Sequence, residues 1–394
     1  MLPVFFCLKT SGESDIDSLL NLLKNSKDTT KINLLLKLST AYQDSNQNKA
    51  LEYLQSAARL AHSTGHKERQ GAVNLSLGIF HHIRSDFDKA MDHYQQALKI
   101  FNEINDDTGI SQAYHDIGAL YEDQGKYSKS LNNFLKALKY TEKTKDTSDI
   151  ANTLNSIGLI HYRMEDYDKS LEFYEKAQKY NIAIGDSLQL ALNYNNIGII
   201  YYFKGNYDKV LEYFKKSLHI YEEIGNTRGQ SRPLYNIGEI LYEQGRHAEA
   251  LDYYTRSLKI DEKIGNRMSQ AGTLVTIGQV YNSQGNYRKA IDYQEKALEI
   301  ANKINSLPVK RDAYLAMSET YEKNGMFEKA LEAYKNAQTI KDSIFNKEKA
   351  RQITELQTKY ETKKKEEKIS NLKRIHELEN LQKENKIKRQ QTFN

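Results

Sequence analysis

Apolar side chains recur along this chain with a period of 40 residues. Glycine marks the period most clearly, and it stands at Gly78, Gly118, Gly158, Gly198, Gly238 and Gly278. An aromatic residue follows most of these glycines nine positions later, and a small residue comes three positions after that. A period of this length is typical of repeat proteins, in which each unit is one supersecondary structure that stacks on the next.

Within each unit the apolar positions have helical spacing. Tyr114, Ile117 and Tyr121 fall at i, i+3 and i+7, on one face of a helix. A second stripe runs from Tyr127 to Leu138, and Gly125 lies between the two stripes. Because glycine readily adopts the positive φ that ends many helices, each unit is predicted to be two amphipathic helices joined by a short turn.

The six repeated glycines fall inside the first predicted helix, where glycine costs roughly 0.5–1 kcal/mol relative to alanine. A compensating gain is therefore needed at each of them. We expect the first helix of each unit to pass tightly against the second helix at this position. The repeated glycines are accordingly predicted to be structural.

Each unit has the order aromatic or leucine, aliphatic, glycine and tyrosine, followed by alanine-leucine, aromatic and alanine. This order resembles the tetratricopeptide repeat, in a 40-residue form, from Thr30 to Ser343. The tryptophan usual in that family is absent. The resemblance implies an all-α fold, a right-handed α-solenoid of about eight helix pairs followed by a long C-terminal helix.

Four segments are expected on this basis. Residues 1–10 are an apolar N-terminus that could be the remnant of a clipped signal peptide, and residues 11–29 read as a capping helix. The repeat array occupies residues 30–343, and residues 344–394 form a basic long helix that could enter a coiled coil. The compartment follows from the first segment: periplasmic or exported if it is a signal remnant, and cytoplasmic otherwise.

In the family that the chain resembles, the first helices line a concave groove that binds a peptide or protein segment. The resemblance places groove residues at fixed offsets from each glycine. Tyrosine offers large rigid contact area, and asparagine can hydrogen-bond a peptide backbone in both directions. The predicted peptide-binding residues are Asn152, Asn155, Tyr162, Asn195, Asn196, Tyr202, Arg232, Tyr235, Asn236, Tyr242, Gln279 and Asn282. The alternative is that the tyrosines only pack on neighbouring first helices.

Charge and composition narrow the classes of partner. The net charge of +5 is concentrated after residue 343, where 14 basic residues face 8 acidic ones, against 43 and 44 in the rest of the chain. A neutral array carries no electrostatic footprint for direct binding of nucleic acid. No run of eighteen apolar residues exists, so no membrane span is expected. The single cysteine, Cys7, excludes an intramolecular disulfide and a cysteine-based zinc cluster.

No catalytic constellation stands out in the sequence. The segment Gly118 to Tyr127 superficially resembles a phosphate-binding loop, but its glycine spacing is wrong and tyrosine replaces the residue that would hold magnesium. His62 and His66 have i, i+4 spacing, yet Gly65 lies between them at a predicted helix end. We therefore expect no enzyme activity, no cofactor and no metal site.

The C-terminal segment favours helix because it contains neither proline nor glycine after Phe345. Its apolar spacing is heptad-like but interrupted, so a homodimeric coiled coil through residues 350–390, a helix folded back on the array and a solvated helix all stay open. The segment resembles the linker of bacterial repeat-containing sensor histidine kinases and helix-turn-helix regulators. The leading hypothesis is a non-enzymatic binding module whose C-terminal helix dimerises or relays a signal. The alternative is the sensory input half of a truncated membrane-bound signalling protein.

Overall fold

The computed structural model describes residues 13–346 and six further helical positions, 349, 364, 368, 371, 372 and 374. Within this part of the chain every regular element is a helix, and no strand occurs. The chain divides into two compact units, Met1–Ile240 and Leu241–Asn394, which we call unit 1 and unit 2. The predicted N-terminal segment 1–10 and most of the predicted helix 344–394 lie outside the described residues.

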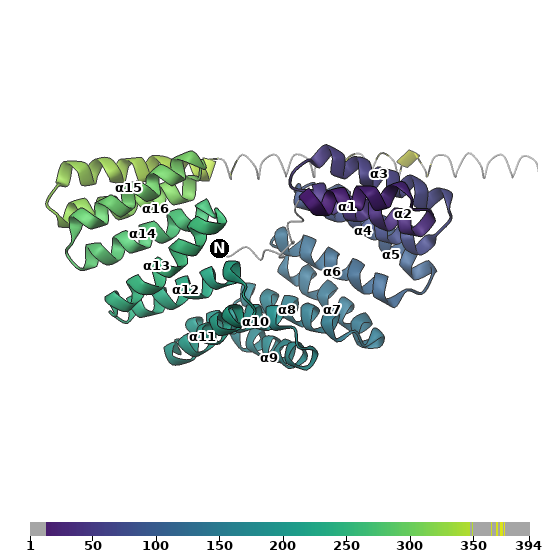
Figure 1. The fold of residues 1–394 in the computed structure, drawn as a ribbon, viewed down its shortest axis with the longest axis horizontal. Helices are drawn as coiled ribbons and strands as arrows, with labels where there is room; N and C mark the ends of the chain where they lie inside the picture. Colours follow the sequence, from purple (N-terminus) through teal and green to yellow (C-terminus); the bar gives the residue numbers. More distant parts are fainter. Residues whose placement is uncertain are drawn as a thin grey trace, which may run out of the picture. The chain divides into compact units, whose positions relative to one another are not determined.

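Unit 1 is a series of antiparallel helix pairs, drawn in purple to teal in Figure 1. Each pair has a first helix and a second helix joined by a short turn, and the single helix α1 precedes the pairs. The helices are α1 (Glu13–Lys24), α2 (Asp28–Tyr42), α3 (Gln47–Ser63), α4 (Lys67–Ile83), α5 (Phe87–Glu103), α6 (Asp107–Asp123), α7 (Tyr127–Thr144), α8 (Thr147–Arg163), α9 (Tyr167–Ile184), α10 (Ser187–Phe203) and α11 (Tyr207–Glu223).

Helix α12 (Thr227–Glu243) begins in unit 1 and ends in unit 2. Unit 2 continues the same pattern in the helices drawn in green. These are α13 (His247–Ile264), α14 (Arg267–Ser283), α15 (Tyr287–Lys303) and α16 (Leu307–Lys323), followed by a helical stretch at residues 327–346. The all-α fold built from repeated helix pairs, which the sequence predicted, is confirmed.

The turn inside each of two helix pairs contains a residue with positive φ, and this residue is glycine in one pair but not in the other. Gly125, between α6 and α7, has a φ of 69°. The equivalent residue between α8 and α9 is Glu165, with a φ of 61°. A side chain at this φ costs roughly 1–2 kcal/mol, which glycine avoids. The backbone of the turn, rather than the glycine, is therefore the constant feature.

Aromatic rings of the second helices lie against the repeated glycines Gly78, Gly118, Gly158 and Gly198, whereas Gln294 lies against Gly278. A Cβ atom added to Gly118 would lie 2.8 Å from Cδ1 of Phe134, and one added to Gly158 would lie 2.9 Å from Cδ1 of Tyr174. The Phe134 and Tyr174 side chains are 1% and 2% exposed. The glycine thus allows a large apolar side chain to be buried directly against the backbone of the partner helix.

A second glycine contact joins neighbouring pairs. The ring of Phe101, at the end of α5, lies between Gly71 of α4 and Gly109 of α6, and a Cβ at Gly71 would come within 2.5 Å of it. Tyr221 lies against Gly229 in the same way. These contacts extend the core of unit 1 from one helix pair to the next.

No helix among the described residues combines the length and the apolar character needed to cross a membrane.

Candidate functional site

The first helices of unit 1 contact one another through residues that lie 41 positions apart. The repeat has 40 residues. Each of these contacts therefore joins a residue to the one that directly follows the equivalent position in the next repeat. These contacts connect α4, α6, α8, α10 and the part of α12 up to Ile240 into one surface, which we call the first-helix face. The contacts are His82 with Asp123, Glu122 with Arg163, His115 with Ser156, Tyr162 with Phe203 and Asn195 with Asn236.

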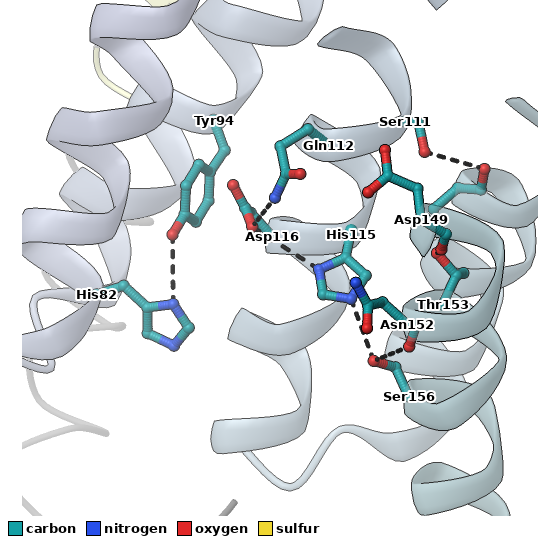
Figure 2. Close-up of polar contacts among 11 residues, drawn as sticks. His82, Tyr94, Ser111, Gln112, His115, Asp116, Asp149, Asn152, Thr153 and Ser156 are labelled. Carbon is teal, nitrogen blue, oxygen red and sulfur yellow. Dashed lines mark hydrogen bonds and ion pairs between the residues drawn. The ribbon is translucent and has the colours of Figure 1, made fainter. Parts of the chain in front are cut away.

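A polar network occupies the face where α6 and α8 meet (Figure 2). Gln112 Nε2 donates to Oδ1 of Asp116 at 2.9 Å, and His115 Nδ1 lies 3.8 Å from the same oxygen. His115 Nε2 lies 3.1 Å from the hydroxyl of Ser156 on the next first helix. Asp116 is 8% exposed, and its Oδ2 has no hydrogen-bond partner. The network therefore leaves one buried carboxylate oxygen unsatisfied.

His82, at the end of α4, contacts the end of α6 and the second helix α5. Its Nε2 lies 2.9 Å from Oδ2 of Asp123, and its Nδ1 lies 3.3 Å from the hydroxyl of the buried Tyr94. Both ring nitrogens thus have partners within unit 1.

Glu122 is the most perturbed carboxylate of the face. Its side chain is 16% exposed, and its nearest cation is Arg163, whose Nε lies 3.9 Å from Oε1. Burial raises the pKa of Glu122 to about 7, against the lowering effect of Arg163. Asp149, at the start of α8, also has a raised pKa, because of burial and of the neighbouring Asp146.

The predicted asparagines of α8 and α10 fall into two groups. Asn155 Oδ1 accepts a hydrogen bond of 2.7 Å from Nδ2 of the buried Asn193, which also donates to the backbone oxygen of Tyr174. Asn152 and Asn196 are half-buried.

Two predicted groove residues are not open to solvent. Asn195 is 5% exposed, and its Oδ1 accepts a hydrogen bond of 3.0 Å from Nδ2 of Asn236. Asn282, in unit 2, is 4% exposed and donates to Glu319. In both cases a residue of the next first helix supplies the partner. The expectation that these two side chains face an open groove is therefore corrected.

The other predicted residues have intermediate or full exposure. Tyr162, Tyr235 and Asn236 are half-buried in unit 1, whereas Tyr202 and Arg232 are exposed there. Tyr242 and Gln279 are half-buried and belong to unit 2. The candidate site of unit 1 therefore consists of the predicted residues from α8 to Asn236, without Asn195.

Five aromatic side chains gather where α8 and α10 end and α9 and α11 begin. Their neighbouring ring centroids are separated by 5.2 to 6.3 Å. Tyr202, Phe203 and Tyr207 are 36%, 48% and 42% exposed. These aromatic side chains thus pack on one another, and three of them are also exposed to solvent. We call Tyr162, Tyr167, Tyr202, Phe203 and Tyr207 the aromatic patch.

No metal-binding group of three or more histidine, cysteine, aspartate or glutamate side chains occurs in the part of the chain that the structure describes.

A family model described as tetratricopeptide repeat matches residues 69–143, 149–223, 205–263, 229–303 and 269–343. The chain belongs to the tetratricopeptide-repeat family. The resemblance found in the sequence is thereby confirmed for the array. The likeness of the C-terminal segment to the linkers of sensor kinases stays a prediction. No curated protein is significantly similar to this tetratricopeptide-repeat chain.

Several solved structures share the fold. The apo form of the quorum sensor NprR from B. thuringiensis superposes with a TM-score of 0.61 at 15% identity, over 83% of this chain and 98% of that one. A signal transduction ATPase with a tetratricopeptide repeat sensor from Pyrococcus horikoshii gives 0.62 at 16%, over 86% and 55%. The Rap conjugation gene regulator of plasmid pLS20, in complex with the Phr* peptide, gives 0.52 at 17%, over 84% and 95%. At these identities the similarity concerns the fold.

Sequence reasoning missed several residues that build the site. Arg163, Asp116 and Asn193 were not among the predicted residues. Arg163 lies next to the predicted Tyr162, and Asn193 donates to the predicted Asn155. Arg163 follows Glu122 by 41 residues, but this spacing identifies the pair only once the offset between neighbouring first helices is known. Asn193 has no sequence signal, because it is a buried residue whose two partners are defined by packing.

Proposed function

We propose that the chain is a non-enzymatic protein-interaction module that binds an extended peptide or protein segment on the first-helix face of unit 1. The observation that carries this proposal is the combination on α10 of the exposed Tyr202 and the half-buried Asn196. An asparagine amide can donate to and accept from the backbone of an extended peptide, and tyrosine supplies contact area at low entropic cost.

The fold comparison supports this proposal. The Rap regulator that shares the fold was solved with a peptide. The continuous contacts between first helices also support it, because a segment laid across α6, α8 and α10 meets side chains from several repeats at once.

The experiment is a selection of peptides by the purified full chain from a phage-displayed random library. The affinity of an enriched synthetic peptide is then measured by fluorescence anisotropy. We expect the double variant Asn196→Ala, Tyr202→Ala to bind at least about tenfold more weakly, since tyrosine anchors dominate many interfaces.

A matched control removes the same residue types elsewhere. Asn132 lies exposed on the second helix α7, and Tyr334 is 49% exposed in unit 2. The variant Asn132→Ala, Tyr334→Ala should bind the enriched peptide as the parent does. Equal affinity of both double variants would contradict the proposed site, and no enrichment at all would contradict the proposed function.

We further propose that residues 350–390 form a homodimer and relay the bound state. The basis is the heptad-like apolar spacing of the sequence. Light scattering during gel filtration should give a dimer for the full chain and a monomer for a chain ending at Asn346. The same mass per array in both would contradict dimerisation through this segment.

A further inference from the structure

We infer that the outer side of the helical stretch 327–346 binds the segment 350–390 of a second copy of this chain, and that the two copies run antiparallel there. Phe327, Leu331 and Tyr334 form the binding surface, which we call the end face. This inference rests on the proposed homodimer and specifies where the partner's segment binds on the array.

The end face is an apolar stripe that is largely open to solvent. Its residues follow i, i+4 and i+7 spacing along one side of the helix. Phe327 is 70% exposed, Leu331 54% and Tyr334 49%. Ala330 and Ala333 of the same stretch pack instead on α16. The terminal repeats of an array need a polar outer surface for solubility, so an exposed apolar stripe at this place indicates a further contact.

The residues equivalent to Tyr334 are covered in earlier repeats. Tyr94, Phe134 and Tyr174 are 0%, 1% and 2% exposed. Each of these rings lies in one core cluster with two aliphatic residues of the next first helix, which are three positions apart. These pairs are Ile117 and Leu120, Ile157 and Ile160, and Ile197 and Ile200. The end face is therefore suited to a helix that presents aliphatic residues at i and i+3.

The chain does not turn back after residue 344 as it does in earlier repeats. Gly185 and Gly225, in the turns that follow α9 and α11, have φ of 68° and 66°. The next first helix then returns over the second helix. Phe345 stands at the equivalent position and is helical, as is Asn346. A positive φ also disfavours a side chain such as phenylalanine. A helix that covers the end face is therefore expected to come from a second copy.

The segment 350–390 has the residue pattern that the end face requires. Aliphatic residues three positions apart occur at Ile353 and Leu356, and again at Ile369 and Leu372. Leu372 is helical and 57% exposed, so its side chain is available to a partner. The segment contains neither proline nor glycine, which favours one helix across the whole end face.

Binding at the end face determines the relative direction of the two copies. Ile353 follows Tyr334 by 19 residues, which is about 29 Å along a continuous helix. In a parallel, in-register coiled coil each segment lies beside its own equivalent and does not reach the partner's end face. In an antiparallel pair the segment passes back along the stretch 327–346 of the other copy. Each first helix runs back along the preceding second helix in the same way.

The first test is photo-cross-linking in the full chain, with p-benzoylphenylalanine in place of Phe327. Irradiation should give a covalent species of twice the chain's mass on a denaturing gel. Mass spectrometry of that species should find position 327 joined to a peptide from residues 350–390. The same amino acid in place of Ile182, which is 55% exposed on α9, is the control and should give no such cross-link.

The second test introduces a charge into the end face. Leu331→Glu should raise the dissociation constant of the full-length dimer at least tenfold, measured by analytical ultracentrifugation, because the partner's apolar residues would then cover a carboxylate. Leu135→Glu is the matched control, since Leu135 is 46% exposed on α7, and it should dimerise as the parent does. The thermal midpoint establishes that both variants are folded.

The outcomes separate this inference from the proposed homodimer. Light scattering first establishes whether the full chain is a dimer. In a dimer, the inference would be overturned if position 327 cross-linked within one chain, cross-linked to the stretch 327–346 of the other copy, or gave no cross-link to residues 350–390. Unchanged dimerisation of Leu331→Glu would overturn it as well. A monomeric full chain would overturn the homodimer and the end face together.

Discussion

At the scale of single residues, the burial of Glu122 makes the stability of the fold depend on pH. Burial raises its pKa to about 7 from an ordinary value of 4.5. The folded state therefore favours the protonated carboxyl. Its stabilising contribution is complete below the pKa of the unfolded chain and is lost as the pH rises through 7. At pH 8 a buried negative charge remains, which costs about 3 kcal/mol by linkage.

The first prediction concerns this loss of stability with rising pH. Glu122→Gln should leave the free energy of unfolding little changed at pH 5, and its stabilising effect should grow by about 2 kcal/mol towards pH 8, because an amide does not ionise. Urea denaturation at several pH values measures the difference. The exposed Glu175→Gln should show no such trend. A Glu122→Gln effect that is constant from pH 5 to pH 8 would contradict the assignment.

A second residue-scale feature is a buried amide without partners. Asn181 of α9 is 1% exposed, and neither its Nδ2 nor its Oδ1 has a hydrogen-bond partner. Asn193 is equally buried but donates to Asn155 and to the backbone of Tyr174. The two asparagines thus have similar burial, but they differ in their donor groups: Nδ2 of Asn193 has two acceptors, whereas Oδ1 of Asn193 and both amide atoms of Asn181 have no partner.

We predict opposite effects of the same substitution at these two positions. Asn181→Leu should stabilise the chain by roughly 1–2 kcal/mol, because leucine has a similar size and no polar group to desolvate. Asn193→Leu should destabilise it by about the same amount or more, because the acceptor of Asn155 loses its donor. The thermal midpoints of both variants test this. A lower midpoint for Asn181→Leu would show that its amide is satisfied in solution.

At the scale of elements, the helix pairs depend on close contact at one glycine. The ring of Phe134 packs directly against the helix backbone at Gly118. Gly272, inside α14, has no atom within 4 Å of where a Cβ would stand. The two residues are both helical glycines, and they differ in whether a neighbour occupies the space beside them.

The prediction is that alanine has opposite effects at these glycines. Gly118→Ala should cost roughly 1–3 kcal/mol, because its methyl group must displace a ring that is enclosed on all sides. Gly272→Ala should stabilise by roughly 0.5–1 kcal/mol, since alanine is the better helix former. Denaturant unfolding of the two variants measures both changes. Stabilisation by Gly118→Ala would remove the packing explanation for the repeated glycine.

The elements were predictable from the sequence to a greater extent than the site. Apolar spacing reflects which face of each helix is buried, so the helix pairs could be derived from residues such as Tyr114 and Ile117. The pairing of Glu122 with Arg163 depends instead on how far one first helix is offset from the next. That offset is a property of tertiary packing. For the same reason the burial of Asn195 could not be predicted, because Asn236 from the next first helix covers it.

At the scale of the molecule, the two compact units have the same local construction. In each, helix pairs contact the pairs next to them, as the ring of Phe101 does between Gly71 and Gly109 in unit 1. In such arrays the stability is approximately the sum of terms within repeats and terms between neighbouring repeats. A local change is therefore expected to have a local effect.

If a local change destabilises only nearby helices, hydrogen exchange measured by mass spectrometry should detect the effect only there. Gly118→Ala weakens the pair of α6 and α7, so exchange should accelerate there and, to a smaller degree, in the adjoining helices α5 and α8. Peptides from α14 and α15 in unit 2 should exchange at the rates of the parent, because several repeats separate them from the altered pair along the chain. Equal acceleration in every helix would mean that the array opens as one cooperative unit, and nearest-neighbour packing would then be the wrong description of its stability.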